Sequence, residues 1–202
     1  DGMLITGAPV EQIAFEQIDY WEELCKIMDY AKGNVFSTLY LCWGAFAGLY
    51  HLHGIQKRPL EEKLFGIFMN ERATLNEPLL RGFDDIFPIP QSRHTTINEE
   101  DIIIHPELSI LAKSSEAGVT LIKSTDNREI FMTGHLEYDT NTLSNEYWRD
   151  KTKNLPINLP KNYFPNNNPC LPPSSYWRST AHLLFSNWLN YYVYQETPYN
   201  FV

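Results

Sequence analysis

The order of apolar and amphipathic segments in the first 54 residues predicts strands that are each followed by a helix. The short apolar segment 3–5 predicts a strand, and the unbroken β-branched and aromatic run 35–41 predicts a strand buried on both faces. Between them, 20–31 predicts an amphipathic helix with Gly33 as its C-cap. A run of small residues after Cys42 predicts a second helix packed tightly on a sheet. This order predicts an α/β fold, with a mostly parallel sheet in a three-layer α/β/α arrangement.

Beyond Gly54 the pattern changes to short strands and turns. A polar turn at 61–62 leads into a strand, and prolines exclude a helix over 88–94. Asp139 or Thr140 is expected to cap a helix that runs to about Asp150, and a Pro- and Asn-rich loop follows it. The last predicted helix, 177–193, is rich in aromatic residues and is either part of the core or a subunit contact in a homodimer. The further predicted strands are 102–104, 108–112, 119–123 and 129–133.

Composition narrows the classes of partner. The 202 residues fit one domain, 1–202, and a net charge of -9 without a basic cluster argues against nucleic acid. Three widely spaced cysteines do not form a disulfide framework, and no apolar run approaches the ~20 residues of a membrane span, so we expect a cytoplasmic protein. The chain opens in mid-strand without an initiator methionine, which leads us to expect an N-terminally incomplete sequence.

Cys42 stands where the buried strand meets the following helix. A cysteine at such a turn is the sulfur counterpart of a nucleophile elbow, because the bend lifts the side chain off the sheet. The free N–H groups and the dipole of the new helix favour the thiolate. A buried structural cysteine explains the local pattern equally well.

A nucleophilic thiol needs a base, and His135 is the best placed of six histidines. It follows a predicted strand and a glycine, and Glu137 two residues on points the same way in an extended turn. Glu137 would then fix the tautomer of the imidazole, as the carboxylate of a triad does. The alternative is a loop histidine held by a neighbouring acid for packing alone.

Other polar residues allow more than one interpretation. The loop 6–9 offers backbone N–H groups to an oxyanion, or is an ordinary turn. Arg93 and His94 form a candidate anion clamp, or a solvated pair. His51 and His53 do not have the spacing of a zinc site, so we expect surface residues and no metal.

Several long segments resemble the homoserine O-acyltransferases of methionine synthesis, the homoserine O-succinyltransferase family. The resemblance covers nearly the whole chain in order. It is carried by 6–11 (TGAPVE), 19–24 (DYWEEL), 41–57 (LCWGAFAGLYHLHGIQK), 62–68 (EKLFGIF), 81–87 (RGFDDIF), 92–94 (SRH), 133–150 (TGHLEYDTNTLSNEYWRD) and the tail from 162. It implies a class I glutamine amidotransferase-like (flavodoxin-like) fold that lacks its N-terminal part.

The resemblance also implies the chemistry. Family members pass an acyl group from acyl-CoA through a cysteine thioester to an amino-acid hydroxyl, with no cofactor. It makes Cys42 the acylated nucleophile, His135 the base and Glu137 its partner. The residues that match the substrate pocket are Lys63, Ser92, Arg93 and Arg149, of which the two arginines are expected to hold the amino-acid carboxylate.

Glu11 bears on the acyl donor. Succinyl-transferring members typically have glycine at its position, so a glutamate excludes the succinyl carboxylate by volume and charge and implies acetyl-CoA. Leu136 and Phe46 depart from the usual Pro and Gln. The acceptor is homoserine or serine, since one methylene is worth only ~1–3 kcal/mol. A cysteine hydrolase or amidotransferase of this fold and a non-catalytic interaction module are the competing functions.

Overall fold

A single seven-stranded sheet organises residues 1–198, which are the residues that this computed structural model describes. The strand order is β1-β2-β7-β6-β5-β3-β4. The strands are β1 (Gly2–Ile5), β2 (Ser37–Leu41), β3 (Arg58–Arg72), β4 (Ile86–Thr96), β5 (Leu108–Ser114), β6 (Gly118–Ser124) and β7 (Glu129–Met132). The helices are α1 (Trp21–Asn34), α2 (Trp43–His53), α3 (Glu99–Ile103), α4 (Thr142–Thr152) and α5 (Arg178–Asn187); the short segments are η1 (Phe15–Gln17), η2 (Pro78–Leu80), η3 (Pro165–Asn167) and the π-helical η4 (Trp188–Tyr194).

The sheet is mixed, so the α/β fold class is confirmed but the expectation of a mostly parallel sheet is not. Among the strands of residues 1–198, only β1–β2 and β2–β7 pair in parallel. The pairings from β7 through β6, β5 and β3 to β4 are antiparallel. The predicted β-loop-α-β-α series therefore describes the parallel end of the sheet, where crossovers require helices, while hairpins build the rest.

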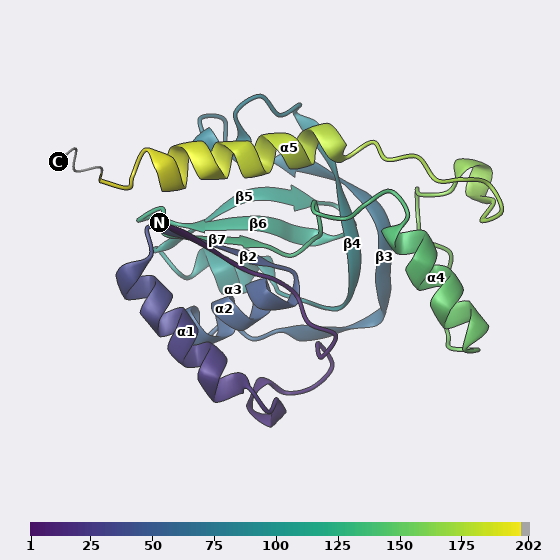
Figure 1. The fold of residues 1–202 in the computed structure, drawn as a ribbon, viewed down its shortest axis with the longest axis horizontal. Helices are drawn as coiled ribbons and strands as arrows, with labels where there is room; N and C mark the ends of the chain where they lie inside the picture. The colour runs from purple at the N-terminus through teal and green to yellow at the C-terminus, as the bar shows by residue number, and fades with distance from the viewer. Residues whose placement is uncertain (199–202) are drawn as a thin grey trace.

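Helices cover both faces at this parallel end, as the buried strand predicted. Every residue of β2 is buried. Leu39 and Leu41 belong to the core beneath α5, whereas Tyr40 belongs to the core beneath α1 and α2. Figure 1 shows α5 along one side of the sheet, with α1, α2 and α3 on the other.

Two local predictions are wrong. The segment 102–104 belongs largely to α3, because Glu99, Glu100 and Asp101 supply acidic residues to its first turn and outweigh a three-residue apolar run. Gly33 lies inside α1, and the helix ends at Asn34 with Val35 as C-cap.

Two strands lie where the sequence did not predict them. β3 includes the predicted turn at 61–62, and β4 includes the segment 88–94, for which only a helix was excluded. β3 runs unbroken through 61–62, with a register shift between Pro59 and Leu64 in its pairing with β4. β4 tolerates Pro88 and Pro90 because it is an edge strand of the sheet, where a missing N–H need not break a ladder. Sequence patterns hide such a strand, since proline ordinarily argues against one.

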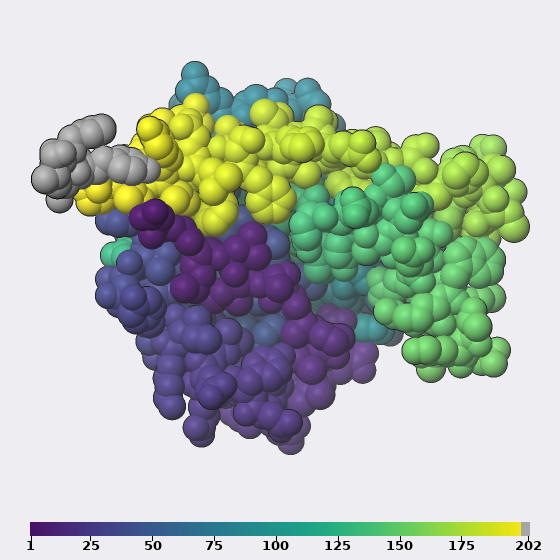
Figure 2. All heavy atoms as spheres, viewed as in Figure 1, coloured from purple at the N-terminus to yellow at the C-terminus, as the bar shows by residue number. Residues whose placement is uncertain are grey.

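The C-terminal part follows its prediction closely. α4 starts one or two residues later than expected, with Asn141 at its N-cap position, and 153–175 is an irregular loop apart from η3. Trp177, Leu184, Trp188 and Tyr192 are buried, so the aromatic load of the last helix belongs to the core. Figure 2 shows the first residues on the surface beside this helix. Among the described helices, none is both long and apolar enough to cross a bilayer.

The first turn of α2 packs directly onto the end of β1. A Cβ at Gly44 would lie 2.6 Å from the carbonyl oxygen of Ile5 and 2.9 Å from that of Thr6, both backbone atoms. Gly44 therefore allows α2 to begin this close to β1, because any other residue would place its Cβ against these carbonyl oxygens. Gly33, also helical, has nothing within 4 Å of such a Cβ.

We expect these two helical glycines to respond oppositely to alanine. Gly44→Ala should lower the free energy of unfolding by about 1–3 kcal/mol, because backbone must move to admit the methyl group. Gly33→Ala should raise it by about 0.5–1 kcal/mol through the better helix propensity of alanine. Urea unfolding followed by circular dichroism measures both, and equal effects would contradict the close contact.

Candidate active site

Cys42 lies at a sharp bend between β2 and α2. Its φ of 48° and ψ of -117° are unusual for a residue other than glycine. The Cys42 N–H donates to the carbonyl of Met132 on β7 (2.7 Å), and the Cys42 carbonyl accepts from Ala45 N (2.9 Å). Strand and helix thus fix the bend from both sides. This confirms the predicted elbow geometry.

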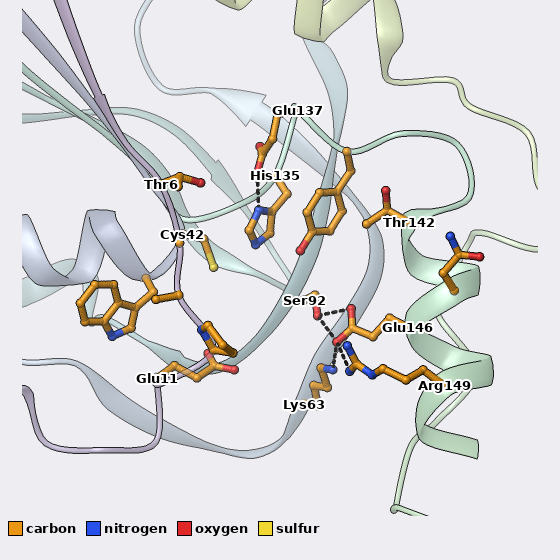
Figure 3. Close-up of a pocket in the computed structure, with 16 residues that line it drawn as sticks. Thr6, Glu11, Cys42, Lys63, Ser92, His135, Glu137, Thr142, Glu146 and Arg149 are labelled. Atoms are coloured by element: carbon orange, nitrogen blue, oxygen red, sulfur yellow. Dashed lines mark hydrogen bonds and ion pairs between the residues drawn. The ribbon is translucent and has the colours of Figure 1, made fainter. Parts of the chain in front are cut away.

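His135 and Glu137 lie in the loop after β7, at the same edge of the sheet as Cys42, because β2 and β7 are parallel neighbours. His135 Nδ1 is 2.6 Å from Glu137 Oε1. Figure 3 shows the imidazole between this carboxylate and the Cys42 sulfur. Although burial alone would lower it, the charge and hydrogen bond of Cys42 and those of Glu137 raise the pKa of His135 to about 10. The arrangement favours a protonated imidazole beside the sulfur.

Backbone contacts hold the histidine loop in place. His135 N donates to the Pro90 carbonyl on β4 (2.9 Å), and a Cβ at Gly134 would lie 2.4 Å from Ile89 Cγ2. The Tyr138 ring stacks on the imidazole, with centroids 4.1 Å apart and 11° between planes. The ring of His135 therefore has a carboxylate at one nitrogen and an aromatic face against its plane.

The thiol opens into a cavity of about 550 Å³. The loop Thr6–Pro9 lines it, and a Cβ at Gly7 would be 3.4 Å from Cys42 Cβ and 3.6 Å from Trp43 N. The loop therefore lies against Cys42 and the start of α2, where the free N–H groups of a helix N-terminus suit an oxyanion. The cavity is lined by Thr6, Gly7, Ala8, Pro9, Glu11, Cys42, Trp43, Lys63, Ser92, His135, Glu137, Tyr138, Thr142, Asn145, Glu146 and Arg149.

A cluster of charges lies across the cavity from the sulfur. Glu146 accepts from Lys63 Nζ (2.5 Å) and from Ser92 Oγ (2.8 and 3.0 Å to its two oxygens). Arg149 Nη2 is 3.7 Å from Glu146 Oε1, while its Nε bonds Asp150 Oδ1 (2.6 Å). Figure 3 shows these groups meeting at one side of the cavity. The cluster offers both cations and an anion.

Sequence reasoning placed Lys63, Ser92 and Arg149 here but missed Glu146. The signal was present: Glu146 precedes Arg149 by three residues on α4, so both lie on one helix face. Tyr138 was also missed, because stacking on His135 depends on the turn that His135 and Tyr138 form.

The prediction that Arg93 lines the substrate pocket is wrong. Arg93 is buried and bonds Gln91 Oε1 (2.9 Å) and the carbonyls of Ala117 (2.6 Å) and Thr95. Successive strand residues face opposite sides, so Ser92 faces the cavity and Arg93 faces away. Burial lowers the pKa of Arg93 to about 10, partly offset by the charges of Cys42 and Glu11.

Glu11 lies at the edge of the cavity, where its carboxylate accepts from the backbone N–H of His94 (2.8 Å).

His51 and His53 end α2, and the expectation that both are surface residues is wrong for one of them. The His53 side chain is 4% exposed and bonds Glu129 (2.8 Å), whereas His51 bonds the exposed Asp29. Within residues 1–198 no group of three or more His, Cys, Asp or Glu side chains is arranged to hold a metal ion. Cys25, Cys42 and Cys170 are all free thiols.

Comparison with known proteins identifies the relatives of this chain. A family model described as homoserine O-succinyltransferase matches residues 1–199. The chain belongs to the homoserine O-succinyltransferase family. It is 59% identical over 199 residues to a homoserine O-acetyltransferase of Geobacillus kaustophilus, covering 98% of this chain and 66% of that protein. It is 58% identical to a homoserine O-acetyltransferase of Desulfitobacterium hafniense (strain Y51), covering 99% and 65%. The chain thus spans just under two thirds of these relatives.

Solved structures show the fold of this family member. A glutamine amido transferase from Methylobacillus flagellatus superposes with a TM-score of 0.70 at 13% identity, over 100% of this chain and 80% of that one. A glutamine amidotransferase from Thermotoga maritima gives 0.65 at 14%, over 93% and 76%. The fold is therefore that of the glutamine amidotransferases, as the sequence resemblance implied.

We expect the titration of His135 to depend on both of its partners. Because the folded-state pKa of about 10 exceeds the ordinary 6.5, its stabilising contribution is complete below pH 6.5 and is lost as pH rises through 10. Cys42→Ala and Glu137→Gln should each lower the midpoint of the His135 ring resonance in a nuclear magnetic resonance titration. An unchanged midpoint in Cys42→Ala would mean that sulfur and ring do not interact.

Proposed function

We propose that this chain forms the catalytic part of a homoserine O-acetyltransferase, which moves an acetyl group from acetyl-CoA to the hydroxyl of homoserine or serine. The observation that carries the proposal is that one cavity joins the Cys42–His135–Glu137 constellation to the charged cluster of Lys63, Glu146 and Arg149. The first group suits acyl transfer through a thioester, and the second suits an amino acid. Such a reaction belongs to methionine or cysteine biosynthesis.

In the first half-reaction the Cys42 thiolate attacks the thioester carbonyl of acetyl-CoA. The Trp43 N–H and the loop Thr6–Pro9 stabilise the oxyanion. The bond between carbonyl carbon and CoA sulfur then breaks, CoA leaves as a thiol with the proton of His135, and Cys42 carries the acetyl group. Glu137 keeps the imidazole oriented and balances its charge.

In the second half-reaction His135 removes the proton of the acceptor hydroxyl, whose oxygen attacks the acetyl-Cys42 carbonyl. The Cys42 sulfur leaves as thiolate and the O-acetyl amino acid forms. Arg149 holds the acceptor carboxylate, since its side chain is 55% exposed toward solvent and retains donors beyond those used by Asp150. Glu146 receives the ammonium group, with Lys63 and Ser92 fixing that carboxylate.

Glu11 limits the donor. Its carboxylate is held in place by the His94 N–H, so an acyl group with a distal anion meets both volume and like charge. This favours acetyl-CoA over succinyl-CoA.

The proposal predicts a burst. Acetyl-CoA without acceptor should release one equivalent of CoA and then stall, and mass spectrometry should find one acetyl group on Cys42. Cys42→Ala should release none. Continuous release would indicate a hydrolase instead, and equal turnover by both proteins would indicate an interaction module.

The acceptor site predicts a separable defect. Arg149→Lys should raise the KM for the acceptor by about tenfold, because an ammonium cannot bind a carboxylate in a fork. The acceptor-independent burst should persist, since Arg149 takes no part in acylation. Arg178→Lys, a change at an exposed arginine bonded to Thr140, serves as the matched control. An Arg149→Lys protein with an ordinary acceptor KM would contradict this assignment.

A further inference from the structure

Tyr138 lines the active-site cavity, and the two proposed half-reactions give it no task. Its backbone is fixed on both sides. The Tyr138 carbonyl accepts from the indole N–H of the buried Trp177 (2.9 Å), and the Tyr138 N–H donates to the His135 carbonyl (3.3 Å). Among residues 1–198, only these backbone groups of Tyr138 form hydrogen bonds, so its hydroxyl retains the capacity both to donate and to accept.

The ring of Tyr138 is held against the catalytic base. It stacks on the imidazole of His135, with centroids 4.1 Å apart and 11° between the ring planes. Because Nδ1 of His135 bonds Glu137, Nε2 is the ring nitrogen that can take a proton from a substrate. A phenol stacked on this imidazole therefore lies beside the place where that proton is transferred.

Charges at both ends of the cavity act on the Tyr138 hydroxyl. Burial, and then the charges of Cys42 and Glu146, raise the pKa of Tyr138 above its ordinary value of 10.0. The pKa of Arg149 is raised chiefly by its bond to Asp150, and the charge of the Tyr138 oxygen adds to this effect. The Tyr138 oxygen thus lies within electrostatic reach of both the nucleophile and the acceptor-binding cluster, and it keeps its proton at neutral pH.

The hydroxyl of the acceptor must enter the same region. Its amino acid is held at Glu146 and Arg149, whereas the carbon that it attacks is on Cys42, across the cavity (Figure 3). A hydroxyl has one proton to donate and two lone pairs. In the attack one lone pair forms the new bond and the proton goes to His135, so the second lone pair is open to a hydrogen-bond donor.

We propose that Tyr138 is a further catalytic residue, whose hydroxyl donates a hydrogen bond to the acceptor hydroxyl oxygen and directs that oxygen toward acetyl-Cys42 and its proton toward His135. The inference rests on the proposed acyl transfer and adds the group that recognises the acceptor hydroxyl. In this step the acceptor O–H bond breaks and its proton passes to His135 Nε2. The new O–C bond forms, and the C–S bond breaks with its electron pair staying on Cys42. Tyr138 keeps its own proton.

The test uses two nucleophiles that differ in their need for this contact. The complete protein is acetylated with acetyl-CoA, freed of CoA, and mixed with homoserine or with hydroxylamine. Hydroxylamine attacks a thioester through its nitrogen lone pair and lacks the carboxylate that Arg149 would hold. Mass spectrometry follows the loss of the acetyl group from Cys42, and the measured quantity is the homoserine-to-hydroxylamine ratio of rate constants within each variant. A general loss of stability cancels in this ratio.

Tyr138→Phe keeps the stacked ring and should lower the ratio by about tenfold, as the loss of one hydrogen bond to the reacting oxygen predicts. Tyr30→Phe, at an exposed tyrosine of α1, is the matched control and should keep the ratio. An unchanged ratio in Tyr138→Phe would overturn the proposal, whether neither rate constant changes or both fall together. If the unaltered protein forms no acetyl-enzyme, the proposed function fails instead, which is a separate result.

Discussion

At Cys42 the backbone adopts a conformation that costs an L residue of the order of 1–3 kcal/mol, and the surrounding structure must supply that energy. β7 contributes through the Met132 carbonyl, and the backbone carbonyls of Ile5 and Thr6 at the end of β1 lie against Gly44 in the first turn of α2. Three neighbouring parallel strands thus converge on one sulfur. The histidine loop leaves β7 directly afterwards, so the strand that holds the bend also delivers the base. Disturbing the parallel end of the sheet would displace nucleophile and base together.

The parts of this protein that sequence reasoning predicts well are those with strong local signals. The strand before Cys42 carries no charge and is buried throughout because helices cover both its faces, and the small residues after it permit a helix to pack closely. His135 and Glu137 could be predicted because side chains two residues apart in an extended turn point the same way. Lys63, Ser92 and Arg149 came from resemblance alone, since three separate elements bring them together.

The predictions that were wrong depended on information that no local pattern holds. A proline-bearing edge strand differs from a loop only through its partner β3, and α3 differs from a strand only through its acidic first turn. Arg93 was misplaced by a single strand position: its neighbour Ser92 faces the cavity, and alternation turns Arg93 into the interior. His53 was predicted to be exposed because it ends a helix, but its side chain is buried and bonds Glu129 on β7.

The charged cluster around Glu146 is paired internally, because each carboxylate oxygen of Glu146 has a partner within it. An amino acid entering this space would exchange partners with the cluster rather than meet bare charges. The hydrogen bonds that it would displace offset part of the free energy that its new contacts contribute. Recognition in such a site depends on matching the arrangement of charges that the cluster already holds.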